Sequence, residues 1–133
     1  MNTYIKLLGL LIVFSLSSCD TTPDSNLNQT EGSEQAKIAK DVSVEEFREL
    51  IKSEGIILDV RTPGECQAGM IEGAVNIDYM EGNFEEAVSK LDKNTPIYIY
   101  CAAGGRSAKA MSELSGLGFT NLYNLLGGYS AWK

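Results

Sequence analysis

Residues 96–107 read PIYIYCAAGGRS and join a predicted strand to a predicted helix through a loop of small residues. The segment Pro96–Tyr100 is rich in β-branched and aromatic side chains, which is typical of a buried strand. From Ser107 to Leu117 apolar side chains recur at helical spacing, and glycines follow. The chain therefore passes from strand to helix through a loop that starts at Cys101 and ends at Arg106.

This loop has the composition of an anion-binding turn. Small residues and paired glycines let successive backbone N–H groups converge, and the start of the helix adds unpaired N–H groups and a positive dipole end. Such surroundings would stabilise the thiolate of Cys101 without a histidine, and Arg106 adds a fixed cation. Cys101 is the candidate nucleophile, and the candidate substrate-binding residues are Ala102, Ala103, Gly104, Gly105, Arg106 and Ser107.

Two residues of the loop also have simpler interpretations. Cys101 could be a small buried apolar residue that ends a strand, which is the commoner fate of a single cysteine. Ser107 could donate a hydrogen bond into the loop, cap the following helix, or do both. The sequence favours the nucleophile for Cys101 and the cap for Ser107.

Strands and helices alternate over the rest of the chain. Ser43-Val44-Glu45-Glu46 has the form of a capping box, which predicts a helix start. Strands separated by helices predict an α/β fold with a parallel sheet covered on both faces, and ligands then sit beyond the carboxyl ends of the strands. The other predicted elements are helix 44–53, strand 56–60, strand 74–77, helix 84–91, strand 121–125 and helix 129–132.

Composition excludes several classes of function. The chain has 133 residues, 11 basic and 18 acidic side chains, a net charge of −7 and no histidine. This length predicts one domain, and the acidic balance argues against binding to nucleic acid or anionic lipid. Without histidine there is no Ser-His-Asp triad, no Cys-His dyad and no zinc site with a histidine ligand.

The amino terminus resembles the signal of a bacterial lipoprotein. The apolar run Leu7–Leu16 is too short to span a membrane, and Leu16-Ser17-Ser18-Cys19 resembles a lipobox. We expect residues 1–18 to be the signal peptide and Cys19 to carry fatty acyl chains such as palmitate. An ordinary signal peptide and an uncleaved anchor are the alternatives. The expected location is the cell envelope, lipid-anchored on the periplasmic side in a Gram-negative cell.

Residues 20–40 are polar, with almost no large apolar side chain, so residues 19–40 are predicted to form the lipidated cysteine and a flexible tether. The folded domain is then predicted to cover residues 41–133.

Over that range the chain resembles the rhodanese-like sulfurtransferases in four ordered blocks: LDVR at 58–61, GMIEGAVNI at 69–77, CAAGGRS at 101–107 and GGYSAW at 127–132. The resemblance implies a rhodanese-like α/β fold, a parallel five-stranded sheet with helices on both faces, and a catalytic cysteine that carries a sulfane sulfur as a persulfide. A six-residue loop from Cys101 to Arg106 matches sulfur-transferring members, whereas related phosphatases and arsenate reductases have one more residue. Met70 stands where most members have histidine.

The resemblance implies transfer of sulfur from a small donor such as thiosulfate to a thiol or cyanide acceptor. The three cysteines, at positions 19, 66 and 101, do not have the spacing of a metal site, and no cofactor is implied. Two other interpretations stay open, an envelope persulfide carrier or interaction module in a redox or sulfur relay, and an inactive binding domain. Asp59 and Arg61 are supporting residues, interpreted mainly as structural, with Glu65 or Glu72 as partners for Arg61. Cys66 is interpreted mainly as buried; pairing with Cys101 or resolving its persulfide are the alternatives.

Overall fold

Strand β4 (Ile97–Tyr100) is the central strand of a parallel sheet in the computed structural model, which describes residues 37–133. The sheet has five strands in the order β1-β5-β4-β2-β3, and every neighbouring pair is parallel. This agrees with the predicted sheet. The other strands are β1 (Ile38–Val42), β2 (Ile56–Asp59), β3 (Val75–Asn76) and β5 (Asn121–Leu125).

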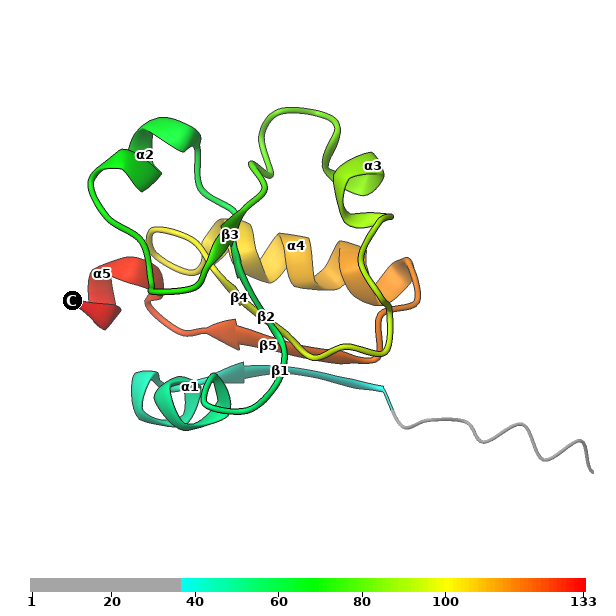
Figure 1. Cartoon of the computed structure of the whole chain (residues 1–133), viewed down its shortest axis with the longest axis horizontal. Coiled ribbons are helices and arrows are strands. Elements are labelled where there is room, and N and C mark those ends of the chain that lie inside the picture. Colours follow the sequence, from blue (N-terminus) through cyan, green and yellow to red (C-terminus); the bar gives the residue numbers. More distant parts are fainter. Residues whose placement is uncertain (1–36) are drawn as a thin grey trace, which may run out of the picture. The chain divides into compact units, whose positions relative to one another are not determined.

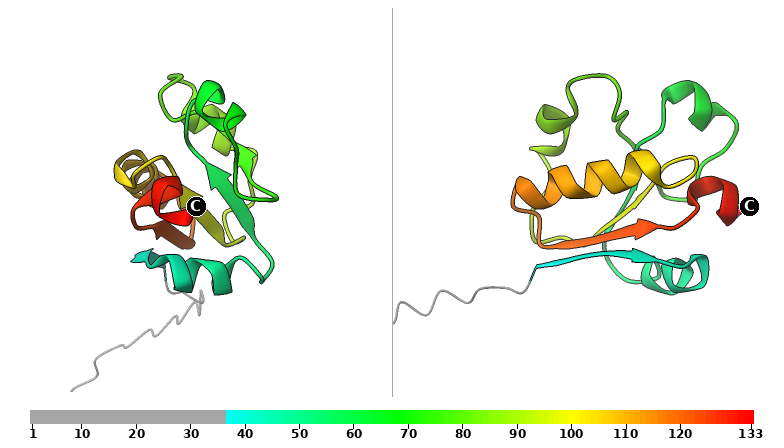
Figure 2. Two further views of the ribbon diagram at one scale, coloured as in Figure 1. Left: turned by 90° about the vertical axis from the view of Figure 1, so that its left-hand side faces the viewer. Right: turned by 180° about the vertical axis from the view of Figure 1, so that it is seen from behind.

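Helices cover both faces of this sheet (Figures 1 and 2). Helices α3 and α4 pack on one face, and α1 and α5 pack on the other. Helix α2 lies at the end of the sheet where the strands finish and stands beside the loop between β4 and α4. The helices are α1 (Val44–Leu50), α2 (Pro63–Gln67), α3 (Phe84–Val88), α4 (Gly105–Gly116) and α5 (Gly128–Trp132).

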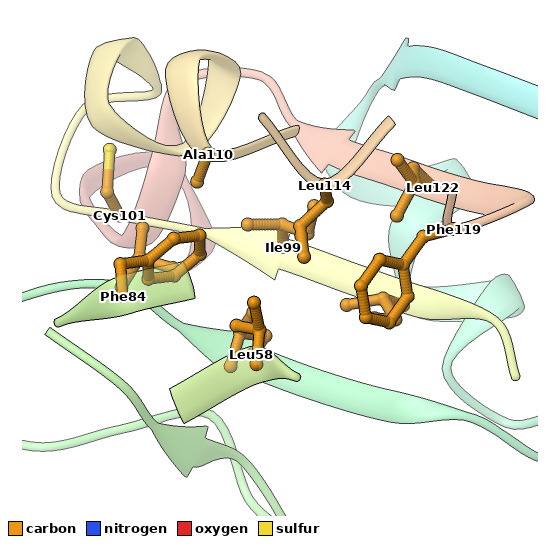
Figure 3. Close-up of a cluster of buried hydrophobic side chains, with 11 residues drawn as sticks. Leu58, Phe84, Ile99, Cys101, Ala110, Leu114, Phe119 and Leu122 are labelled. Carbon is orange, nitrogen blue, oxygen red and sulfur yellow. The ribbon is translucent and has the colours of Figure 1, made fainter. Parts of the chain in front are cut away.

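A cluster of buried apolar side chains lies on each face of the sheet. The side chains of β4 contribute to both clusters, because successive residues of a strand point to opposite faces. Ile97 and Ile99 pack under α4 together with Cys101, whereas Tyr98 and Tyr100 pack on the side of α1. Figure 3 shows Cys101 at the edge of the cluster that lies between the sheet and α4, beside the start of α4. The alternation that buries β4 therefore also places the cysteine on the α4 side of the sheet.

Strand β1 was not predicted, and it starts the folded part at Ile38 instead of Asp41. Its residues pair with β5 over their whole length, from Ile38 opposite Asn121 to Val42 opposite Leu125. Only Val42 is buried, so the strand depends on main-chain hydrogen bonds more than on side-chain burial. A sequence pattern based on apolar alternation does not detect such an edge strand.

Helix α2 was not predicted either, because none of its five residues is buried. Its start is fixed by Thr62 and Glu65, which form a capping box, and by Pro63 in the first turn. Helix α4 begins at Gly105, two residues earlier than expected, and its buried residues are Ser107, Ala110 and Leu114.

The predicted signal peptide, the lipidated Cys19 and nearly all of the predicted tether lie outside the described residues. Among residues 37–133, none of the helices combines the length and apolar character that crossing a membrane requires.

Phe47 anchors α1 to the sheet, and its loss should be costly. Its side chain is fully buried and makes edge contacts with Tyr98 and Trp132. We expect Phe47→Ala to lower the free energy of unfolding by about 3–5 kcal/mol in urea titrations. Ile38→Ala, at a residue 39% exposed on β1, should cost less than about 1 kcal/mol. Equal losses in the two variants would contradict this account of the core.

Candidate active site

Cys101 follows the last residue of β4 and is buried at the base of the loop that leads to α4. The backbone N–H of Gly104 donates a hydrogen bond to its sulfur over 3.0 Å. The Ser107 hydroxyl lies 3.4 Å from the sulfur and 3.1 Å from the carbonyl oxygen of Gly104. Together with the backbone N–H groups of Ala103 and Ser107, these two groups form a ring of donors around the sulfur.

The first turn of α5 fixes the direction of the loop's peptide groups. The N–H of Tyr129 donates to the carbonyl of Cys101 over 2.7 Å, and the N–H of Ser130 donates to the carbonyl of Ala102 over 3.0 Å. In a trans peptide the C=O and the following N–H point in opposite directions. The N–H groups of Ala102 and Ala103 therefore point away from α5, and that of Ala103 is one of the donors to the sulfur.

Two glycines make this arrangement possible. A Cβ on Gly128 would lie 2.5 Å from the carbonyl oxygen of Cys101, so any side chain there would separate α5 from the loop. Gly104 has φ +103°, a left-handed conformation that reverses the chain before α4 and aims its N–H at the sulfur.

Helix α4 starts immediately after this turn and runs for 12 residues. Its first N–H groups have no partner inside the helix, and the helix dipole places partial positive charge there. Gly104, not Ser107, is the N-cap residue, so the expected capping role of Ser107 is wrong. The Ser107 hydroxyl instead lies within the loop beside Cys101.

These donors decide the ionisation of Cys101. Burial opposes formation of the thiolate, but the hydrogen bonds from the Ser107 hydroxyl and from the backbone N–H groups of Ser107, Gly104 and Ala103 outweigh it. The pKa of Cys101 is consequently held below its ordinary value.

Arg106 is held by a carboxylate that the sequence analysis did not assign to the site. Its two terminal nitrogens donate to the two carboxylate oxygens of Glu65 over 2.8 and 2.6 Å. Glu65 also accepts a hydrogen bond from the backbone N–H of Thr62 in the capping box of α2. The hydrogen bond from Arg106, followed by those from Thr62, lowers the pKa of Glu65 to about 2. The Thr-x-x-Glu spacing of Thr62 and Glu65 predicts the capping box of α2. No pattern in the nearby sequence predicts that Glu65 also pairs with Arg106, 41 residues away.

Asp59 and Arg61 form a second ion pair, which is buried. Arg61 donates to both carboxylate oxygens of Asp59, with a shortest distance of 2.6 Å, and to the carbonyl of Gly69 over 2.8 Å. The expectation that Glu65 or Glu72 supplies the carboxylate was wrong, because residues two apart at a strand end face the same side. Burial opposes the charge on Asp59, but the bonds from Arg61 keep its pKa below the ordinary value.

Arg61 also lies over the ring of Tyr129, 4.2 Å from its centroid, so this pair joins the end of β2 to α5. The pair is internally balanced in charge and buried, which fits the structural interpretation of both residues.

Cys66 does not share the environment of Cys101. It is half-buried on α2, and both cysteines are free thiols in the described part of the chain. Burial, followed by the nearby carboxylate of Asp59, raises the pKa of Cys66 to about 11. At neutral pH it is a protonated thiol and a poor nucleophile.

Comparison with known proteins agrees with this geometry. The model of the rhodanese-like domain family matches residues 43–133. The chain belongs to the rhodanese-like domain family. In this domain the loop from Cys101 to Arg106 lies between the end of β4 and the start of α4, and it carries the ion pair between Arg106 and Glu65.

Relatives of this rhodanese domain include named sulfurtransferases. Thiosulfate sulfurtransferase 16, chloroplastic, of Arabidopsis thaliana is 35% identical over 109 residues, which cover 74% of this chain and 91% of the relative. A thiosulfate sulfurtransferase GlpE of Pseudomonas putida is 32% identical over 95 residues, covering 71% of this chain and 84% of the relative.

Solved structures show the same fold. A rhodanese-like domain protein of Staphylococcus aureus has a TM-score of 0.63 and 33% identity, covering 71% of this chain and 91% of its own. The human single-domain sulfurtransferase TSTD1 has a TM-score of 0.61 and 30% identity, covering 71% and 96% of the two chains.

The ring of donors around Cys101 predicts how its reactivity depends on pH. Only the thiolate reacts with iodoacetamide, so the rate should rise to its plateau below the pH at which free cysteine does so. Ser107→Ala removes the hydroxyl near the sulfur, so its curve should shift to higher pH. Mass spectrometry of the peptide that contains Cys101 follows the reaction without interference from Cys66. Superimposable curves for the two proteins would show that the hydroxyl does not stabilise the thiolate.

Proposed function

We propose that this protein is a sulfurtransferase that carries a sulfane sulfur as a persulfide on Cys101. The observation that carries the proposal is the position of Cys101, buried at the base of a loop whose N–H groups and hydroxyl surround its sulfur. Membership of the rhodanese family and the names of its relatives support the same chemistry.

In the first half-reaction the Cys101 thiolate attacks the outer sulfur of a donor such as thiosulfate. A new S–S bond forms to Cys101, the S–S bond of the donor breaks, and its electron pair leaves with sulfite. The charge on the attacking sulfur moves to the persulfide, which the same N–H groups of Ala103, Gly104 and Ser107 stabilise.

In the second half-reaction an acceptor such as cyanide or a thiolate attacks the outer sulfur of the persulfide and restores the Cys101 thiolate. Because the acceptor reacts only after the first product has left, the steady-state kinetics should be of the ping-pong type. Ser107 and the backbone N–H groups stabilise charge in both steps. Arg106, whose charge Glu65 balances, orients the donor through the N–H groups that Glu65 leaves free.

The direct test is thiosulfate:cyanide activity of the full chain. Cys101→Ser should have no measurable activity, whereas Cys66→Ser, which replaces the other described cysteine, should retain at least about half. Incubation with thiosulfate should add the mass of one sulfur atom to the Cys101 peptide. Activity in Cys101→Ser would remove Cys101 from this role, and a persulfide without turnover would favour a sulfur carrier over an enzyme.

We further propose that the protein is anchored in the cell envelope through lipid on Cys19, with the residues before Ile38 as the tether. The support is the sequence alone, a short apolar run followed by Leu16-Ser17-Ser18-Cys19. In bacteria expressing the full chain, a palmitate analogue should label the protein and the protein should sediment with membranes. Cys19→Ala should lose the label and most of the membrane-bound fraction. A variant that keeps both would overturn the proposal.

A further inference from the structure

The net positive charge beside Cys101 is smaller than the presence of Arg106 in the loop sequence suggests. Arg106 is the only charged residue between Cys101 and Ser107, and its guanidinium is paired through two hydrogen bonds with the Glu65 carboxylate. The pair is only partly exposed, with 26% of the Arg106 side chain and 35% of the Glu65 side chain open to solvent. The cation beside the nucleophile is therefore compensated before any substrate arrives.

Glu65 is well suited to hold this position. The backbone N–H and the hydroxyl of Thr62 each lie 3.0 Å from one oxygen of its carboxylate, and the N–H of Glu65 donates in return to the Thr62 hydroxyl. The carboxylate is therefore fixed to the start of α2, and it stays ionised over the whole neutral range. In Figure 1 helix α2 stands beside the loop, so the ion pair joins two segments that are distant in the sequence.

A second cation near the strand ends is neutralised in a similar way. Arg61 pairs with the buried carboxylate of Asp59. With Cys101 as thiolate, neither of the two ion pairs adds net positive charge beside the sulfur.

We infer that this site prefers sulfur donors that carry no more than one negative charge, the class to which the persulfides of uncharged thiols belong. Glu65 is then the positioning residue that sets the preference against dianions. The inference rests on the proposed sulfur transfer and specifies its donor. Thiosulfate, a dianion, gains little from a guanidinium that is already neutralised and is repelled by the Glu65 carboxylate.

Transfer from a persulfide balances without any further reactant. The Cys101 thiolate attacks the outer sulfur of R–S–SH, and an S–S bond to Cys101 forms as the S–S bond of the donor breaks. The electron pair leaves on the inner sulfur as the thiolate R–S⁻. The proton stays on the transferred sulfur, so no oxidant and no reductant is consumed.

Glu65→Gln tests the inference with little disturbance of the fold. Glutamine can still accept the hydrogen bond from the N–H of Thr62, so the cap of α2 is kept while the charge is lost. Glu49→Gln is the matched control, because it removes the same charge from an exposed residue of α1 that pairs with Lys52. Thermal unfolding checks that all three proteins are folded.

The first measurement compares two donors that differ in charge, thiosulfate and the methanethiosulfonate monoanion. For charges roughly 6 Å apart in an aqueous dielectric, Glu65→Gln should raise kcat/KM about tenfold with thiosulfate and about threefold with the monoanion. Glu49→Gln should change neither by more than about 1.5-fold, because salt screens distant surface charges. Equal gains for both donors, or no gain with thiosulfate, would overturn the inference.

The second measurement does not require sulfur transfer. Alkylation of Cys101 is followed with neutral iodoacetamide and anionic iodoacetate, and Glu65→Gln should raise the rate with iodoacetate relative to iodoacetamide about threefold. An unchanged ratio, or the same change in Glu49→Gln, would refute the electrostatic role of Glu65 even if the substitution of Glu65 disturbed the donor assay. If no donor transfers sulfur to Cys101 in the unaltered chain, the proposed function fails, and the donor preference fails with it.

Discussion

The candidate site depends on one contact, in which the first turn of α5 donates hydrogen bonds to the carbonyls of Cys101 and Ala102. The N–H groups of Tyr129 and Ser130 bind the carbonyls of Cys101 and Ala102, and only a glycine at position 128 allows this approach. With these carbonyls bound by α5, the following N–H groups point away from α5, and that of Ala103 is a donor to the sulfur. A helix of five residues at the end of the domain therefore determines the electrostatics of a cysteine that lies far before it in the sequence.

Two ion pairs complete the site, Asp59–Arg61 and Glu65–Arg106. They are buried to different extents, so they differ in their effect on stability. The Asp59–Arg61 pair is almost fully buried and also bonds to Gly69, so it holds the segment after α2 against the sheet. Breaking such a pair leaves an uncompensated charge in the interior, which is costly. The Glu65–Arg106 pair is partly exposed, so its contribution to stability is modest. Its importance lies in fixing the charge and position of a guanidinium beside the nucleophile.

Sequence patterns predicted the elements whose side chains are buried. Strand β5 was confirmed over Asn121–Leu125, and β4 was confirmed apart from Pro96, because burial on both faces selects apolar residues. Strand β1 and helix α2 were missed because main-chain pairing and a cap, not burial, hold them. The ring of donors around Cys101 follows from the loop sequence, whereas the pairing of Arg106 with Glu65 depends on how α2 folds back over the loop. Such a contact has no local signature.

The absence of histidine fits a reaction of the proposed kind. A thiolate that attacks a sulfane sulfur expels sulfite or another thiolate, and both leave as stable anions without a proton from the protein. No general acid is then required, and no general base is required if the cysteine is already ionised. The N–H groups of Gly104, Ala103 and Ser107 meet that single requirement with dipoles that do not titrate. Because these dipoles keep their strength at every pH, the ionisation of the nucleophile follows its own titration. Under the proposed donor preference, the Glu65 carboxylate then discriminates between donors by their charge.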